Sequence, residues 1–431
     1  MRSESGTTLS ALADCATMRT LSRWFLAAVL TLLLALLTAL VLAVEGKPRV
    51  PPRDDVSPAD IDRAVALARL HDPRAAVAGQ LRRAPLSERD IDLLVSHAAR
   101  RFVAANTRVR LQPGRLLVQA SAAVPFGYWL NVELGLRQAA ALPEVDRLRV
   151  GRLPLPSALA WPLLRTVAAR RGVQVDALLA VDWIDRVNFL EGRMTVSYRI
   201  GPDTAKRLRA ALVPPVDQER LRAYNDRLAA VTQDATGDEI SLAALWPPLF
   251  ALAAQRSAAG GDADEENRAA LLTLTFFASQ RPLGLMVPAA YDWPRPRPLY
   301  VTLQGRHDFA LHFLVSALVA AEAGTPLADA VGLWKELADA RRGGSGFSFN
   351  DLAADRAGTR FGELAVRDTA RLHARVAAGM GEADFMPDAS DLPEFLAERE
   401  FVARYGGVGG AGYNRLLADI EARLDALPVF R

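Results

Sequence analysis

The longest apolar run of the chain covers residues 24–44, and its only polar side chains are Thr31 and Thr38. As an α-helix this run spans roughly 31 Å, which matches the hydrocarbon core of a bilayer, about 30 Å. The residues at its end, Leu42-Ala43-Val44-Glu45, lack the small-residue pattern of a signal-peptide cleavage site. We therefore predict an uncleaved transmembrane anchor over 24–44 that binds membrane lipid.

Farther along, apolar and polar residues alternate with a period of two, which is typical of half-buried strands. The alternating segments are Arg108–Leu111, Arg115–Ala123, Trp129–Arg137, Arg147–Val150, Ile184–Leu190 and Arg193–Ile200, the last two forming a hairpin around Glu191-Gly192. Helix starts at Ser57 and Ser87 precede them, and a helical segment at Ser157–Ala169 lies between them. This pattern predicts an α+β domain with an antiparallel sheet over residues 56–203.

From residue 204 to residue 431 the pattern is helical, which predicts an all-α C-terminal domain. The apolar stretches 241–254 and 270–279 are too short to cross a membrane, so we expect buried core helices there. We expect residues 260–267 to form an acidic loop and a helix to run over Glu394–Tyr405.

The segments around the apolar run suggest a membrane topology. Residues 1–23 form a short tail, in which Met18 is an alternative start that would make residues 1–17 an upstream extension. Residues 45–55 are rich in proline and predict an extended stalk. A short tail before a large body favours an N-in/C-out topology, although the flanking positive charges do not decide it. This topology predicts a cytoplasmic tail and a periplasmic body on the bacterial inner membrane.

Charge and composition narrow the classes of function. The 52 basic and 49 acidic side chains give a net charge of +3 over 431 residues, which is no electrostatic footprint for nucleic acid. Lysine occurs only at Lys47, Lys206 and Lys335, a bias towards arginine that fits a GC-rich bacterial genome. The single cysteine, Cys15, excludes a disulfide within the chain. The sequence contains no phosphate-binding loop, dinucleotide-binding motif or serine nucleophile elbow.

The segment 306–363 holds most of the candidate chemistry. On a helix that is apolar over Phe309–Ala321, Asp308, His312 and Ser316 recur at intervals of four and form a narrow polar stripe. Because a buried carboxylate or imidazole needs a polar partner, we expect this stripe to contact another polar group.

Two further helices follow in this segment. One is predicted from Pro326 to Arg341 and carries Lys335, Glu336 and Asp339. After a glycine-rich break, Ser348 and Asp351 predict a capping box that opens the next helix, with Asp355 one turn later.

This combination resembles the YfiM-type bacterial envelope lipoproteins and their membrane-bound relatives. The similarity is confined to about residues 306–363 and rests on His312-Phe313, Lys335-Glu336, Asp339, Gly344 to Ser348, Asp351-Leu352, Ala354-Asp355 and Gly358. The chain departs from the pattern because it lacks a lipobox cysteine and carries a large additional domain. The resemblance implies a location in the cell envelope and no particular reaction.

Three hypotheses remain for the polar cluster, which comprises Asp308, His312, Lys335, Glu336, Asp339, Asp351 and Asp355. In the first, these groups link three helices and have no chemistry. In the second, Asp308, His312, Glu336 and Asp355 bind a divalent metal that supports hydrolysis. In the third, Glu336 is a general acid that acts on a glycan.

The first hypothesis favours a non-catalytic envelope scaffold or interaction protein with an envelope protein partner and no cofactor. The other two favour a periplasmic metal-dependent or glycan-cleaving hydrolase, and the sequence leaves the question of enzymatic activity open.

Overall fold

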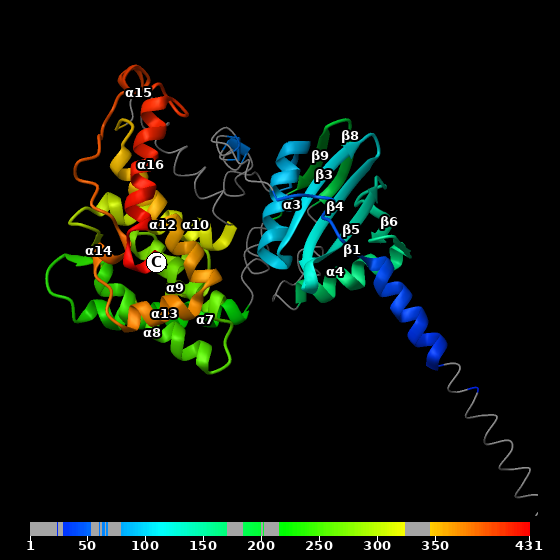
Figure 1. Ribbon diagram of the computed structural model, residues 1–431, viewed down its shortest axis with the longest axis horizontal. Coiled ribbons are helices and arrows are strands. Elements are labelled where there is room, and N and C mark those ends of the chain that lie inside the picture. Colours follow the sequence, from blue (N-terminus) through cyan, green and yellow to red (C-terminus); the bar gives the residue numbers. More distant parts are fainter. Residues whose placement is uncertain are drawn as a thin grey trace, which may run out of the picture.

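The computed structural model describes residues 24, 29–52, 60, 63–64, 66–67, 79–169, 184–199, 201, 215–323 and 345–431. Figure 1 shows two parts: a sheet region, formed by the described residues between 44 and 199, and a helical region, formed by those between 215 and 431. The predicted mixed fold, antiparallel sheets with helices followed by a helical C-terminal part, is therefore confirmed. The two regions meet where α3 (Glu88–Val103) approaches α10 (His307–Ala323).

The larger sheet of the sheet region is antiparallel, with strand order β3-β4-β5-β6-β7 and with β1 paired to β5. Its strands are β1 (Val44–Glu45), β3 (Ala105–Gln112), β4 (Arg115–Val124), β5 (Tyr128–Arg137), β6 (Glu144–Val150) and β7 (Leu153–Leu155). The four strands predicted by alternation between residues 108 and 150 are confirmed. β3 and β6 begin three residues before their predicted starts, and the bounds of β4 and β5 differ from the prediction by one residue.

The smaller sheet has the order β2-β9-β8 and contains β2 (Leu81–Ser87), β8 (Ile184–Leu190) and β9 (Arg193–Arg199). The hairpin around Glu191-Gly192 is confirmed. Strand β2 was not predicted because Pro85 interrupts its pattern. This proline is tolerated because β2 is an edge strand, where one side of the backbone makes no ladder hydrogen bonds.

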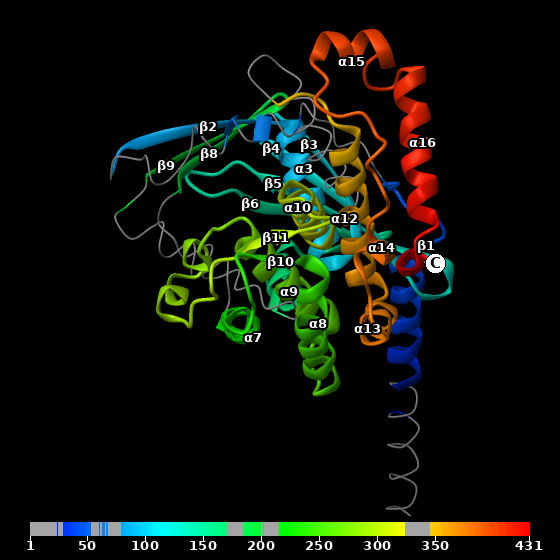
Figure 2. The ribbon, with the colours of Figure 1, turned by 90° about the vertical axis from the view of Figure 1, so that its left-hand side faces the viewer.

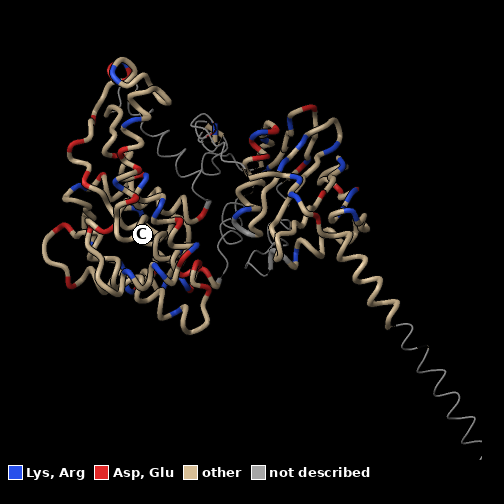
Figure 3. The backbone as a smooth tube through the Cα atoms, viewed as in Figure 1, with Lys and Arg blue, Asp and Glu red and all other residues tan. Residues whose placement is uncertain are grey.

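The core of the sheet region lies between the apolar face of the larger sheet, the smaller sheet and α3. Its fully buried side chains are Ile91, Val109, Leu111, Leu116, Val187 and Phe189. Every second residue of each strand points to the opposite face of the larger sheet, and the polar positions of the alternating pattern lie there. Figure 3 shows basic residues along these strands. The short helix α4 (Ala160–Ala169) follows β7.

Residues 44–50 pack against the sheet, so the predicted stalk over 45–55 is wrong for its first half. Strand β1 pairs with Leu130 and Trp129 of β5. The backbone N–H of Arg49 donates to Ser121 Oγ and Asn131 Oδ1, both at 3.1 Å, and Val50 is fully buried. The segment is held because these two side chains on the polar face accept hydrogen bonds from its backbone.

Residues 29–43 form an apolar helix immediately before β1. Eight of its large aliphatic side chains are 55–65% exposed, whereas Val29 and Leu42 are less exposed. The eight are Leu30, Leu32, Leu33, Leu34, Leu36, Leu37, Leu40 and Val41. Thr38 donates its hydroxyl to the carbonyl of Leu34 at 2.8 Å, so its polar group is satisfied within the helix. Residues 25–28 of the predicted anchor lie outside the described residues. Among the helices that are described, none is both long and apolar enough to cross a membrane.

Other predicted segments lie wholly or partly outside the described residues. The predicted tail, residues 1–23, and the helix Pro326–Arg341 lie outside entirely. Of the helix predicted from Ser57, the described residues 60, 63–64 and 66–67 are helical.

The helical region packs its longer helices around an aromatic core. Its helices are α7 (Pro215–Gln233), α8 (Leu242–Ala258), α9 (Ala263–Ala278), α10, α12 (Phe349–Arg367), α13 (Thr369–Ala377), α14 (Glu382–Phe385), α15 (Glu398–Tyr405) and α16 (Ala411–Asp425). Figures 1 and 2 both show α10 and α12 side by side. The region is not wholly α-helical, because β10 (Glu239–Ser241) and β11 (Tyr300–Thr302) pair in parallel. Strands of three residues have no pattern that sequence analysis can detect.

Helices α8 and α9 account for the two short apolar stretches. Both are buried core helices, as predicted, and α8 continues through Pro247 and Pro248. The predicted acidic loop over 260–267 is wrong from residue 263 onward. Its acidic side chains form the first turn of α9, where negative charge stabilises a helix.

Two other predictions fail near residue 348. Ser348 does not form a capping box with Asp351, because its hydroxyl accepts instead from the backbone N–H of Phe395 at 3.2 Å. The helix predicted from Glu394 begins only at Glu398, because the backbone of Leu396 pairs with that of Phe347. Long-range contacts therefore replace local capping at this point.

Candidate functional site

The structure brings together part of the predicted polar cluster. Asp308 and His312 lie on α10, and Asp351 and Asp355 lie on α12. Lys335, Glu336 and Asp339 lie outside the described residues, so neither the general acid Glu336 nor its place in a metal site can be examined.

Helices α10 and α12 cross unusually closely. A Cβ atom on Gly358 or Gly362 would collide with the backbone carbonyls of Phe313 or Ala317 on α10. Only glycine permits this approach, so Gly358, which is part of the YfiM-like pattern, has a packing role. The polar residues of the cluster therefore lie beside a tight helix interface.

The centre of the cluster is the buried carboxylate of Asp355. Its Oδ1 accepts hydrogen bonds from His312 Nδ1 at 3.0 Å and from Ser316 Oγ at 2.8 Å. His312, Ser316 and Asp355 are 6%, 1% and 4% exposed, respectively, so these bonds link α10 to α12 within the protein interior. Within the described residues, Asp355 Oδ2 is buried and has no hydrogen-bond partner.

This arrangement favours the tautomer of His312 that is protonated on Nδ1, because a carboxylate oxygen accepts hydrogen bonds. Nε2 is then the remaining ring nitrogen. Nε2 lies 3.7 Å from Asp351 Oδ2, which is too far for a hydrogen bond. Ser316 binds the carboxylate and not the imidazole, so the three residues do not have the order of a nucleophilic Ser-His-Asp triad.

Arg306 holds the outer end of the cluster. Its guanidinium contacts Asp308 at 2.5 Å and Glu394 at 2.8 Å, and it lies 4.1 Å from the centre of the Phe309 ring. Burial alone raises the pKa of Asp308 and of Glu394, but the hydrogen bonds and charge of Arg306 outweigh it, with Asn350 also bonding Glu394. Both carboxyl groups therefore have a lowered pKa.

The described residues do not assemble the predicted metal site. Asp308 faces Arg306, while His312 and Asp355 bond to each other. No group of three or more His, Cys, Asp or Glu side chains within the described ranges could hold a metal ion. The observed geometry supports a polar connection between α10 and α12. This connection extends from the buried Asp355 to the partly exposed Arg306.

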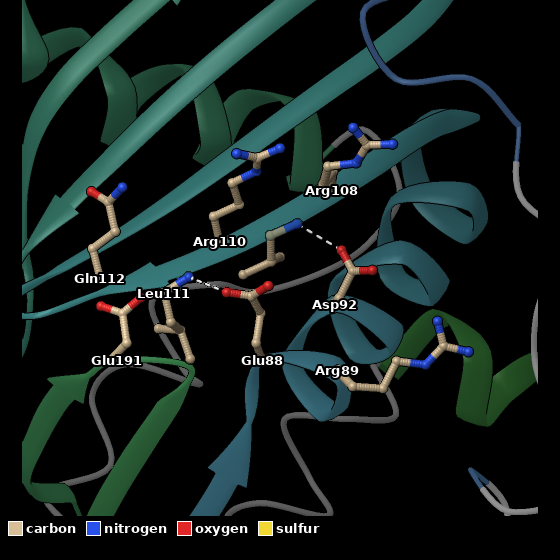
Figure 4. Close-up of a pocket in the computed structure, with 9 residues that line it drawn as sticks. Glu88, Arg89, Asp92, Arg108, Arg110, Leu111, Gln112 and Glu191 are labelled. Carbon is tan, nitrogen blue, oxygen red and sulfur yellow. Dashed lines mark hydrogen bonds between the residues drawn. The ribbon is translucent and has the colours of Figure 1, made fainter.

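A second candidate site, which sequence analysis missed, is a cavity of about 620 Å³ in the sheet region. It follows the outer edge of β3 beside the first turns of α3 and the β8–β9 turn, as Figure 4 shows. The backbone N–H groups of Val109 and Leu111 donate to Asp92 Oδ1 at 2.6 Å and Glu88 Oε2 at 2.7 Å. The sequence signal for this contact is the four-residue spacing of Glu88 and Asp92, which places both on one face of a helix.

Comparison with known proteins indicates neither a family nor a function for this chain. The chain matches no protein-family model, no curated protein and no solved structure.

Proposed function

We propose that this chain is a single-pass bacterial inner-membrane protein, anchored through residues 24–44, with a periplasmic body that is a non-catalytic scaffold or interaction module of the cell envelope. The observation that carries the proposal is the continuous exposure of large aliphatic side chains along residues 29–43. Monomeric soluble proteins rarely expose apolar patches of this extent, and such patches mark membrane or partner contacts. The length and composition of the whole apolar run in the sequence, residues 24–44, favour lipid as the contact.

The attachment of this helix to the body supports the same proposal. The carbonyl of Leu42 accepts from the backbone N–H of Arg152 at 2.8 Å. Gly151, with φ +57°, lies so close that any side chain would collide with the carbonyls of Leu42 and Ala43. A fixed junction between an apolar helix and a folded sheet is expected of a membrane anchor that positions the folded body.

The polar cluster supports a scaffold more than an enzyme. His312 Nδ1 and Ser316 Oγ both bond to the carboxylate of Asp355, and Arg306 pairs with Asp308 and Glu394. These groups link elements of the helical region. The resemblance of residues 306–363 to YfiM-type lipoproteins remains an expectation and favours an envelope location.

Membrane fractionation tests the anchor. We expect the full chain to stay in the membrane pellet after alkaline carbonate washing and to be released by detergent. Leu36→Arg together with Leu37→Arg should release it, because each arginine near the centre of a span costs roughly 3 kcal/mol. Leu94→Arg, which alters an exposed leucine of α3, is the matched control and should leave the protein in the pellet. Wild-type protein in the soluble fraction would contradict the anchor.

Topology and partnership need separate measurements. Alkaline phosphatase fused after Arg431 should be active, whereas an inactive fusion beside an active cytoplasmic reporter would reverse the topology. Affinity purification of the full chain in mild detergent should recover a reproducible envelope partner. Failure to recover one would count against the scaffold.

One observation favours the alternative, a periplasmic hydrolase. The Nδ1 bond to Asp355 orients His312 in the manner of a histidine–carboxylate pair that acts as a general base. Stoichiometric divalent metal in the purified full chain would support a metal-dependent version, and its absence would remove that version.

A further inference from the structure

Two arginines on β3, Arg108 and Arg110, differ from the ion-paired arginines of the polar sheet face. Arg149 of β6 also has a buried Nε without a partner within the described residues, but it does not line the cavity beside β3. Three of the others form ion pairs: Arg115 with Asp146, Arg137 with Glu144, and Arg147 with Glu133. Within the described part of the chain, the side chains of Arg108 and Arg110 have no hydrogen-bond or ion-pair partner, and Nε of Arg108 is buried. A buried N–H donor without an acceptor is unfavourable, so this position favours a ligand that supplies one.

Both arginines line the 620 Å³ cavity beside β3. They are two residues apart on one strand, so they stand on the same face, and Figure 4 shows both side chains extending to the same side of β3. Paired guanidinium groups match the planar geometry of a carboxylate, which each can bind through two N–H groups. The arginine side of the cavity therefore suits a carboxylate.

The opposite side of the cavity is acidic. Glu88 uses Oε2 to hold the edge of β3, and its backbone N–H donates to the carbonyl of Gly192 at 3.0 Å. This second bond fixes the β8–β9 turn, and with it the exposed Glu191, next to Glu88. Within the described residues the carboxylate of Glu191 has no partner. This side therefore suits an ammonium group.

The walls of the cavity offer little apolar surface. Val109 and Leu111 contribute their backbone, because their side chains are each 2% exposed and belong to the core behind the sheet. The other lining residues are charged or polar: Glu88, Arg89, Asp92, Arg108, Arg110, Gln112 and Glu191. Recognition here would depend on the charges of the ligand and not on an apolar side chain. A volume of this size lies within the range of small-molecule sites, about 300–1,000 Å³.

We propose that this cavity binds a short peptide with free termini, its carboxylate on Arg108 and Arg110 and its ammonium group near Glu88 and Glu191. The two charged sides provide one site for each end of such a zwitterion. The proposal concerns the sheet region only and does not depend on membrane anchoring.

Calorimetric titration of the full chain in detergent tests the ligand class. Trialanine should bind with one-to-one stoichiometry. Its C-terminal amide should bind at least tenfold more weakly, and its N-acetyl form several-fold more weakly, because each removes one of the two charges. Inorganic phosphate should compete poorly, since it lacks the ammonium group.

Variants test the residues. Arg108→Gln and Arg110→Gln should each weaken the binding of trialanine at least tenfold, and Glu191→Gln should reduce the penalty for N-acetylation. Arg137→Gln is the matched control, because Arg137 is exposed on the same face but is paired with Glu144. It should leave affinity unchanged. Circular dichroism of each variant establishes that it is folded.

Several results would overturn the proposal. These are no binding of trialanine, equal affinity for the peptide and its amide, an effect of Arg137→Gln as large as that of Arg108→Gln, or competition by phosphate at equal concentration. The last result would define a general anion site. None of these outcomes bears on fractionation, so failure here is distinguishable from failure of the anchor.

Discussion

A buried carboxylate of the helical region and two arginines of the sheet region differ in how their charges are partnered. In the helical region, the carboxylate of Glu266 is 1% exposed and is held by Arg220, Arg256 and the hydroxyl of Tyr224. In the sheet region, Arg108 and Arg110 have no protein partner within the described residues and border a cavity. Charged groups that are paired within the protein stabilise the fold, whereas charged groups without a protein partner at a cavity are suited to binding a ligand. The comparison indicates a structural role for Glu266 and supports the proposed binding role of Arg108 and Arg110.

The hydrophobic cores of the two regions also differ, in size and in aromatic content. The helical region buries a continuous aromatic cluster, in which Trp246 stacks on Phe361 at 4.8 Å and contacts Phe250, Phe313 and Phe385. Within its described residues, the sheet region has a small buried apolar cluster and gains additional order from polar contacts at its edges. Substitution of Glu266 should therefore cost stability, whereas substitution of Arg108 or Arg110 should cost mainly binding.

The largest effect should come from Glu266→Gln. This change removes the negative charge between two partly buried guanidinium groups and should lower the free energy of unfolding by about 3 kcal/mol. Urea titration followed by far-ultraviolet circular dichroism measures it. Glu400→Gln, which removes one partner of the exposed Arg404–Glu400 pair, is the control and should change stability by less than about 0.5 kcal/mol. Equal effects of the two variants would break the contrast between internal and exposed charge.

Next in size is Gly358→Val. The added side chain would push α12 away from the Phe313 carbonyl, and we expect a loss of about 2–3 kcal/mol. Gly381→Ala is the control, because an added Cβ there meets only ordinary contact with Asp384. Tolerance of valine at Gly358 would show that α10 and α12 need not cross so closely.

Asp355→Asn should have a smaller effect, about 1–2 kcal/mol, because it weakens the hydrogen bonds from His312 and Ser316 while keeping the shape of the side chain. The same urea titration measures it, with the exposed Asp419→Asn as control. If Asp355→Asn left stability unchanged, the link between α10 and α12 would not be structural, and a chemical role for His312 would gain support.

The smallest effect should be the acid dependence of the Arg306 contacts. Asp308 and Glu394 have folded-state pKa values below the ordinary 3.8 and 4.5. Their stabilisation is therefore complete above the unfolded-state pKa and is lost as the pH falls through the folded-state pKa. Arg306→Gln should lower the urea midpoint at about pH 7, and its difference from wild type should shrink as the pH falls through the lowered folded-state pKa values of Asp308 and Glu394. A constant difference across this range would exclude these carboxyl groups as the cause.

Sequence analysis succeeded where one local pattern determines the structure. Alternation located β3 to β6, and Ser87 caps α3 as predicted, with its capping box completed by Asp90. It failed where a distant partner decides: Pro85 lies in a strand because β9 pairs with it, and Ser348 serves Phe395 instead of its own helix.

The candidate site shows the same division. Helical spacing correctly placed Asp308, His312 and Ser316 on one face of a helix. It could not reveal that Asp308 pairs with Arg306, whereas His312 and Ser316 bond to Asp355. The partners come from another helix and from the residues before α10, and the sequence does not fix how these pack.

The junction between residues 29–43 and the sheet has a mechanical consequence. The chain enters β1 directly from the helix, β1 pairs with the central strand β5, and Arg152 holds the last turn of the helix. Because no flexible linker separates the helix from β1, we expect a tilt of the helix to rotate the sheet by the same angle. Tension applied along the helix enters the middle of the sheet and is shared with strands on both sides.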